Sequence, residues 1–173
     1  MCKVGASELP FRLLCRRYGV DLAYTPMMNS ELFAHDAEYR SKEFQSTPED
    51  RPLVAHFSAN NPQILKQAAL LVEDACDAID INLGCPQRVA FAGHFGSFLL
   101  GPEDRSLVLA MVSEVSQNVK IPVFAKIRLL DSVEETVELC RQLHEAGASL
   151  IAIHVQLSGD ICLHIMLGRR GLG

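Results

Sequence analysis

The sequence predicts an α/β fold built on a parallel sheet, and three observations lead to this prediction. Five short apolar segments are typical of strands, and each interval between them is long enough to hold a helix. No G-x-G-x-x-G motif follows the first segment, which counts against a Rossmann dinucleotide-binding sheet. A closed (β/α)8 barrel typically takes about 250 residues, so 173 residues with five strands would form a partial TIM barrel. An open doubly wound sheet also remains compatible with this pattern.

The five predicted strands are runs of apolar, β-branched and aromatic residues. The first run, DLAYT, ends at Pro26, and the third, AIDINL, leads into Gly84. The last run, SLIAIH, is almost continuously apolar, which suits a strand covered on both faces. In chain order, the predicted strands cover residues 21–25, 52–58, 78–83, 122–127 and 149–154.

Helices are predicted where apolar residues recur at helical spacing after a residue that can cap a helix. Asn60 or Asn61 can cap a helix that has Pro62 in its first turn, and Ser132 begins a capping box. Gly19 lies where the first helix is expected to stop. The predicted helices cover residues 11–17 after a Ser7 cap, 62–72, 102–119 and 132–146.

Three stretches give no clear element. Residues 29–50 are polar and mixed, which predicts a long loop with one short helix, and a loop of that length is uncommon unless it has a function. Residues 87–101 hold three glycines and are predicted to form another loop. Residues 155–173 have no clean period, so we expect a loosely ordered tail there.

The composition limits the class of protein. Hydrophobic residues make up 49% and charged residues 21%, which indicates a packed core and excludes disorder throughout. The formal net charge of −5 means that any nucleic-acid role has to rest on a local patch or on a further domain. With no apolar run near the ~20 residues of a membrane helix and no signal-peptide pattern, we expect an intracellular protein, cytoplasmic or nuclear, with mitochondria not excluded. Six cysteines without a C-x-x-C pair predict free thiols.

Polar side chains gather at the carboxyl ends of the predicted strands. In a parallel α/β fold, functional sites form at that edge of the sheet. Each strand contributes one or two such groups: Thr25, His56, Asn82 with Cys85, Lys126 with Arg128, and His154. The sequence therefore predicts a site at this edge.

Cys85 and Lys126 each allow a chemical and a structural interpretation. Gly84 and Pro86 restrain the chain around Cys85, so its thiol could be a nucleophile or a general acid, or a buried structural cysteine. Lys126 lies in an apolar strand and could meet an electron-rich ring, a phosphate or a Schiff-base substrate, or extend to solvent.

The remaining histidines and carboxylates predict no metal and no acid–base pair. His56 and His154 could each be core histidines, and the other four histidines share no metal-ligand spacing. Asp77 and Asp80 stand three residues apart on a predicted strand, so they would point to opposite faces.

Several segments resemble the tRNA-dihydrouridine synthase family. The most specific is the run DAIDINLGCPQRVAFAGHFGSFLL at residues 77–100, which contains N-x-G-C-P followed by a spaced G-x-x-G. The likeness covers residues 4–154 and is greatest to the eukaryotic branch that modifies positions 16 and 17 of the tRNA D-loop. The other segments that carry it are residues 7–19, 23–33, 51–62, 120–129 and 150–154.

The resemblance implies a (β/α)8 barrel that binds FMN at the carboxyl ends of its strands and reduces tRNA uridine to 5,6-dihydrouridine with NAD(P)H. A small helical domain binds the tRNA in this family. Cys85 matches the cysteine that gives a proton to uracil C5, and Asn82 the asparagine beside flavin and uracil. Lys126 matches a lysine that binds the flavin ring, His154 a histidine that contacts FMN, and Arg128 an arginine on the substrate side.

The chain also departs from the family pattern. His56 stands where the family has a flavin-contacting glutamine, and Val155-Gln156-Leu157 replaces Gly-Arg-Thr. The family's first strand, ending in Ala-Pro-Met, and its later phosphate-binding loops have no counterpart. We therefore expect residues 1–154 to form an incomplete FMN-dependent barrel domain and residues 155–173 a divergent tail, in a truncated chain that is weak or inactive alone.

Two other functions remain open at this point. The chain could be a non-enzymatic interaction fragment that pairs through an open sheet edge. It could also be an aldolase-type barrel that forms a Schiff base on Lys126, although the N-x-G-C-P run argues against this.

Overall fold

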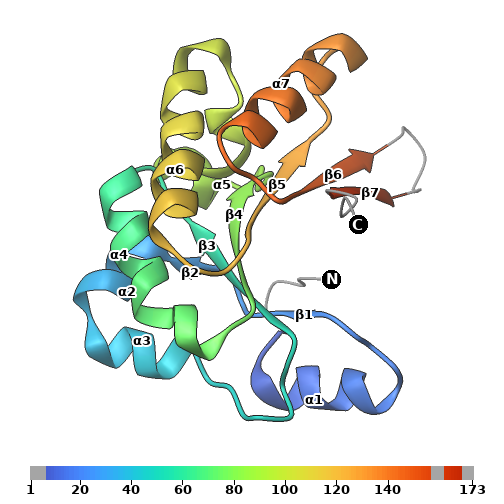
Figure 1. Ribbon diagram of the computed structural model, residues 1–173. Helices are drawn as coiled ribbons and strands as arrows, with labels where there is room; N and C mark the ends of the chain where they lie inside the picture. Colours follow the sequence, from blue (N-terminus) through green and yellow to red (C-terminus); the bar gives the residue numbers. More distant parts are fainter. Residues whose placement is uncertain (1–6, 157–161, 169–173) are drawn as a thin grey trace.

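The computed structural model describes residues 7–156 and 162–168, which form one curved sheet with helices on its outer side (Figure 1). The strand order is β1-β3-β4-β5-β6-β7, with β2 pairing β3 on the same side as β1. All pairings are parallel except that of β7 with β6, which is antiparallel. The strands are β1 (Ala23–Tyr24), β2 (Met28–Asn29), β3 (Leu53–Ser58), β4 (Ala78–Leu83), β5 (Val123–Arg128), β6 (Leu150–Gln156) and β7 (Cys162–Gly168).

Since β1 and β2 occupy one position beside β3, the sheet has five parallel positions, as part of a (β/α)8 barrel would. This confirms the predicted fold class. The helices are α1 (Leu9–Arg17), α2 (Ser30–His35), α3 (Ala37–Glu43), α4 (Pro62–Val72), α5 (Arg88–Ala92), α6 (Arg105–Asn118) and α7 (Val133–Glu145). Three short 3₁₀ turns are η1 (Glu73–Ala75), η2 (Gly96–Leu99) and η3 (Pro102–Asp104).

Two of the predicted helix caps form as expected. The Asn61 side chain accepts hydrogen bonds from the backbone N–H groups of Gln63 and Ile64, the second and third residues of α4. The Ser132 hydroxyl accepts one from the Glu135 N–H at the start of α7. The Ser7 cap was wrong: α1 begins at Leu9, and Glu8 occupies the cap position without a side-chain bond.

The segment predicted as a long loop with one helix contains two helices. The Asn29 side chain accepts from the Leu32 N–H and caps α2. The Asp36 carboxylate accepts from the Glu38 and Tyr39 N–H groups and caps α3. These helices are too short for an apolar period to show in the sequence, so only the two capping residues could have indicated them.

The other two stretches without a predicted element also hold regular structure. Residues 87–101 contain α5 and η2 rather than only a loop. At the carboxyl end, β6 continues to Gln156, and β7 pairs antiparallel with it in place of the expected irregular tail. A hairpin partner satisfies the backbone groups of β6 without requiring a side-chain pattern of its own.

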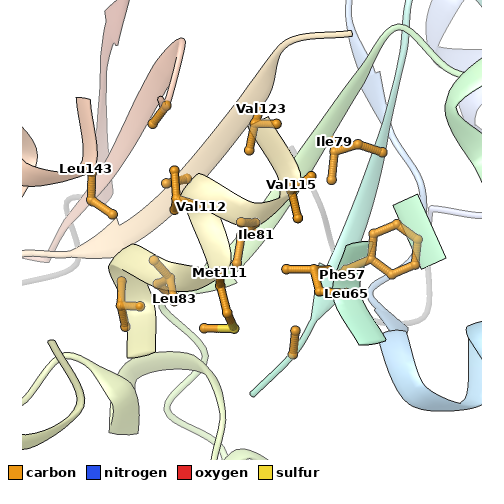
Figure 2. Close-up of a cluster of buried hydrophobic side chains, with 14 of the residues drawn as sticks. Phe57, Leu65, Ile79, Ile81, Leu83, Met111, Val112, Val115, Val123 and Leu143 are labelled. Atoms are coloured by element: carbon orange, nitrogen blue, oxygen red, sulfur yellow. The ribbon is translucent and has the colours of Figure 1, made fainter. Parts of the chain in front are cut away.

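The main core lies between the sheet and its outer helices. Alternate residues of β4, Ile79, Ile81 and Leu83, point toward α6 and pack with Met111 and Val115 (Figure 2). Because side chains alternate along a strand, the other residues of β4 point to the opposite face, which we call the inner face. Within the described part of the chain, no helix has the length and apolar character needed to cross a membrane.

Candidate active site

The inner face of the sheet brings most of the predicted site residues together. The strand register pairs His56 with Asp80, Asn82 with Lys126, and Arg128 with His154. Paired residues of adjacent parallel strands lie on the same face, so all six side chains belong to the inner face. The inner-face residues of β3 and β4 are buried, whereas those of β5 are only half-buried.

The turn that carries Cys85 follows β4 and is held by three hydrogen-bonding groups. The Asn82 Oδ1 atom accepts from the Gly84 N–H at 3.1 Å and the Cys85 N–H at 2.9 Å. From β5, Arg128 Nε donates to the Gly84 carbonyl at 2.8 Å. From η2, the Ser97 N–H and hydroxyl both donate to the Cys85 carbonyl at 3.0 Å. The backbone direction at Cys85 is therefore fixed, and its free thiol is half-buried.

Two glycines allow this turn to pack closely. A Cβ on Gly84 would lie 3.3 Å from the Lys126 carbonyl oxygen, so Gly84 serves close packing on β5. The backbone of Gly84 itself does not have a positive φ. Gly96 does have a positive φ, +69°, and a Cβ there would lie 2.7 Å from the Cys85 carbonyl oxygen.

Beneath the turn lies a buried polar group centred on His56. Asn82 Nδ2 lies 2.8 Å from His56 Nε2, and Asp80 Oδ2 lies 3.4 Å from the same nitrogen. The Tyr24 ring meets the imidazole edge-on. Within the described residues, His56 Nδ1 and both Asp80 oxygens have no hydrogen-bond partner.

Burial controls the protonation of this group. Desolvation, together with the Lys126 cation, lowers the pKa of His56 to about 3. Desolvation raises the pKa of Asp80 to about 8, against an opposing effect of Lys126. At neutral pH the imidazole is therefore neutral and the carboxyl is largely protonated.

Asp80 is the member of this group that sequence reasoning missed. The signal was present, because Asp80 and Asn82 are alternate polar residues in an otherwise apolar strand and so share a face. Asp77 lies just before β4, where it pairs with Arg51 and accepts from the Leu53 N–H. The two carboxylates are thus apart, in line with the prediction that they form no pair.

Thr25 was grouped with the site but has a backbone role. Its hydroxyl accepts from the His56 N–H at 3.0 Å and donates to the Pro26 carbonyl at 2.8 Å. It thereby holds β3 against the end of β1.

A cleft of about 380 Å³ opens on the same rim as the Cys85 turn. Ser97 and Arg128, which both hold the turn, contribute to its wall, as do Arg105, Asp131 and Glu135. The half-buried Lys126, Arg128 and His154 side chains offer hydrogen-bond donors on the inner face. Such donors fit the carbonyl oxygens and ring nitrogens of a flavin, so the residues present are compatible with FMN.

Comparison with known proteins identifies the class to which this fold and site belong. Residues 3–157 match the model of the dihydrouridine synthase (Dus) family, so the chain belongs to that family. It is 46% identical over 154 residues to the tRNA-dihydrouridine(16/17) synthase of Saccharomyces cerevisiae. It is 44% identical to the tRNA-dihydrouridine(16/17) synthase-like protein of Mus musculus and 42% identical to the Schizosaccharomyces pombe enzyme.

These matches cover most of this chain but little of the relatives. They span 87%, 87% and 89% of the chain, and 36%, 32% and 39% of the three relatives in the same order. The chain therefore spans about a third of the length of the curated relatives it matches.

Proposed function

We propose that this chain acts in the reduction of uridine to 5,6-dihydrouridine in the D-loop of tRNA, with FMN as cofactor and NAD(P)H as reductant. The observation that carries the proposal is the restrained Cys85 turn, which stands beside Asn82 and is held by Arg128 from β5. Two of the relatives are named tRNA-dihydrouridine(16/17) synthase [NAD(P)(+)], which supports the same substrate and reductant. We also propose an intracellular location, since the proposed substrate is a tRNA.

In the proposed reaction, Cys85 is the general acid. Its thiol gives a proton to C5 of the uracil ring and becomes a thiolate, which solvent then reprotonates. FMN, when bound and reduced by NAD(P)H, would supply the hydride that is added at C6. The backbone bonds from Asn82 and Ser97 fix the origin of the Cys85 side chain before substrate arrives, so less ordering is required at the reacting atoms.

The other inner-face residues bind and orient. Lys126 places a positive charge on the inner face, where it would bind the flavin ring and favour its anionic reduced form. Asn82 and His154 would contact the cofactor, and His56 would stand beside it in place of the family's glutamine. Arg128 holds the Gly84 carbonyl through Nε, and its other guanidinium nitrogens make no hydrogen bond within the described residues, so they could meet the uracil or a phosphate.

The first test is FMN binding by the purified chain. Titration with FMN should quench flavin fluorescence, and Lys126→Met should weaken the binding by more than tenfold. Lys120→Met is the matched control, because Lys120 is an exposed lysine that pairs with Glu73 on the surface. Stoichiometric FMN binding by the wild-type chain would refute the expectation that the chain is weak or inactive alone, whereas absence of binding would contradict a flavin site on this chain.

The second test places residues 3–157 in the S. cerevisiae relative, in exchange for its matching segment. The chimera should form dihydrouridine on unmodified tRNA, and Cys85→Ala should abolish this while flavin reduction by NADPH continues. Cys15→Ala, a half-buried thiol on α1, is the control. Retained uridine reduction in Cys85→Ala would remove Cys85 from its role, and a borohydride-trapped imine on Lys126 would favour the aldolase alternative.

A further inference from the structure

The side-chain amide of Asn82 can adopt only one orientation in this site. Its oxygen accepts from two backbone N–H groups, those of Gly84 and Cys85. If the amide were flipped, its NH2 group would face both of these donors and two good hydrogen bonds would be lost. The NH2 group must therefore point toward His56, where Nδ2 lies 2.8 Å from Nε2.

This orientation determines where the proton of His56 resides. A neutral imidazole has one donor nitrogen and one acceptor nitrogen. Since Asn82 donates to Nε2, that nitrogen is the acceptor and the proton is on Nδ1. Asp80 Oδ2 faces the same Nε2 atom at 3.4 Å, where an ionised carboxylate would meet a lone pair instead of a donor. The geometry thus favours a neutral Asp80 carboxyl.

We propose that Asp80 and His56 form a proton-holding pair that positions Asn82 and, through it, the Cys85 turn. These two buried residues then act as positioning residues for the site. Their relevance to catalysis rests on the proposed function. The charged group that acts on the pair is the Lys126 ammonium on β5, with Arg128 further along the same strand. β1 contributes the Tyr24 ring edge, and β4 the Asn82 amide.

Removal of one proton from the pair would switch it to a second arrangement. When Asp80 loses its proton to solvent, the carboxylate attracts a donor. The imidazole then releases its Nδ1 proton and takes one on Nε2, which can donate to Asp80. Nε2 no longer accepts from Asn82, so the Asn82 amide loses one of its three anchors. The Cys85 turn is therefore expected to loosen as the pH rises through the pKa of Asp80, about 8.

The test is an NMR titration of the ¹⁵N-labelled full chain from pH 6 to 9.5, which requires neither flavin nor tRNA. The imidazole nitrogens of His56 should report a Nδ1–H tautomer at pH 6 and a Nε2–H tautomer at pH 9.5. The backbone amides of Gly84 and Cys85 should shift with the same midpoint. A Nε2–H tautomer at every pH, or constant Gly84 and Cys85 amides, would overturn the proposal.

Two variants make the test specific. The side chain introduced by Asp80→Asn cannot ionise, so His56 should remain the Nδ1–H tautomer at every pH. The pH-dependent step in the Gly84 and Cys85 amide shifts should then vanish. Asp77→Asn is the same chemical change three residues away, at a carboxylate that pairs with Arg51, and it should leave the step intact. A step that persists in Asp80→Asn, or that disappears in Asp77→Asn, would contradict the assignment.

A second readout follows the Cys85 thiol itself. At pH 6.5, His56→Ala removes the acceptor of Asn82 and should raise the rate of Cys85 alkylation by iodoacetamide several-fold. His56→Gln should restore the wild-type rate, because the glutamine oxygen can accept from Asn82. Equal rates in His56→Ala and wild type would refute the positioning role. These measurements can fail while dihydrouridine formation is observed, or succeed while it is not, so the two proposals are separable.

Discussion

The absence of a side chain at Gly96 allows η2 to pack closely against the Cys85 turn. A Cβ at this position would lie 2.7 Å from the Cys85 carbonyl oxygen, and the backbone φ of +69° disfavours any other residue. Gly19 has a comparable φ of +86°, but a Cβ there would meet nothing within 4 Å. The two glycines therefore separate the cost of backbone strain from the cost of a steric clash.

We expect Gly96→Ala to lower the free energy of unfolding by at least about 1 kcal/mol more than Gly19→Ala does. Both variants place an alanine at positive φ, which strains the backbone. Only in Gly96→Ala must the new Cβ also push the Cys85 turn away from η2. Urea denaturation measures the difference, and Cys85 alkylation should change in Gly96→Ala alone. Equal destabilisation of the two variants would mean that the Cys85 turn moves to accommodate the added Cβ without a loss of stability.

The shifted pKa values of Asp80 and His56 change the free energy of unfolding with pH in opposite directions. The pKa of Asp80 is raised from 3.8 to about 8, so its stabilising contribution is complete below about pH 4 and is lost as the pH rises through about 8. The pKa of His56 is lowered from 6.5 to about 3, so its contribution is complete above pH 6.5 and is lost as the pH falls through about 3. Between about pH 4 and 6.5 the two slopes cancel.

Above pH 6.5 only the effect of Asp80 remains. The free energy of unfolding should therefore fall by about 2 kcal/mol between pH 6.5 and 8, and Asp80→Asn should remove that fall. Asp77→Asn, which changes a partly exposed carboxylate, should retain it. Urea denaturation at pH 6.5, 7.2 and 8 measures the slope, and the same slope in wild type and Asp80→Asn would contradict the assignment of a buried neutral carboxyl.

The residues of the candidate site were largely predictable because each follows from its position at a strand end. His56, Asn82, Lys126, Arg128 and His154 share the inner face for that reason. What the sequence could not disclose were the bonds between them. The contact between Asn82 and His56, and the buried state of Asp80, depend on how β3 and β4 align in register, which no local pattern determines.

Among the elements, α1 is attached to the sheet by a buried ion pair. The Asp50 carboxylate is fully buried and accepts from Arg12 at 2.6 and 2.9 Å and from Arg16 at 3.2 Å. Arg12 also donates to the carbonyls of Ser7 and Gln45. These contacts tie the helix to the loop before β3. In Figure 1, α1 lies apart from the other helices.

Asp50→Ala should lower the free energy of unfolding by about 3–5 kcal/mol, because it leaves the Arg12 guanidinium buried without its partner. Glu138→Ala is the matched control: it removes a carboxylate that also pairs with an arginine, Arg141, but on the exposed face of α7. It should cost less than about 1 kcal/mol. Equal losses in the two variants, measured by urea denaturation, would show that the buried pair does not attach α1.

The long elements were predictable from sequence and the short ones were not. The predicted strand at 78–83 matches β4, and Asn61 and Ser132 fix the starts of α4 and α7. In contrast, α2, α3 and α5 have five to seven residues each, less than two turns, so no period could show. β7 was missed because an antiparallel partner at this point breaks the alternation of strand and helix.

At the level of the whole molecule, the two faces of the sheet differ in how tightly they are closed. The outer face packs against α4, α6 and α7 (Figure 1), whereas the inner-face side chains of β5 remain half-buried. β4 is buried on both faces and has hydrogen-bonded strands on both sides. α5, in contrast, is one short helix with Val89 and Phe91 exposed.

This contrast predicts two classes of backbone hydrogen exchange. The amides of β4 should exchange only through global unfolding, whereas those of α5 should exchange through local opening and much faster. Asp50→Ala separates the two classes. A global destabilisation should lower the free energy of exchange in β4 by the same amount that urea denaturation reports for unfolding. It should leave α5 unchanged, since local opening does not require the detachment of α1. Mass spectrometry of peptides covering residues 78–83 and 88–92 measures both rates. Equal protection of the two segments, or equal acceleration by Asp50→Ala, would show instead that α5, which follows the Cys85 turn, unfolds only together with the sheet.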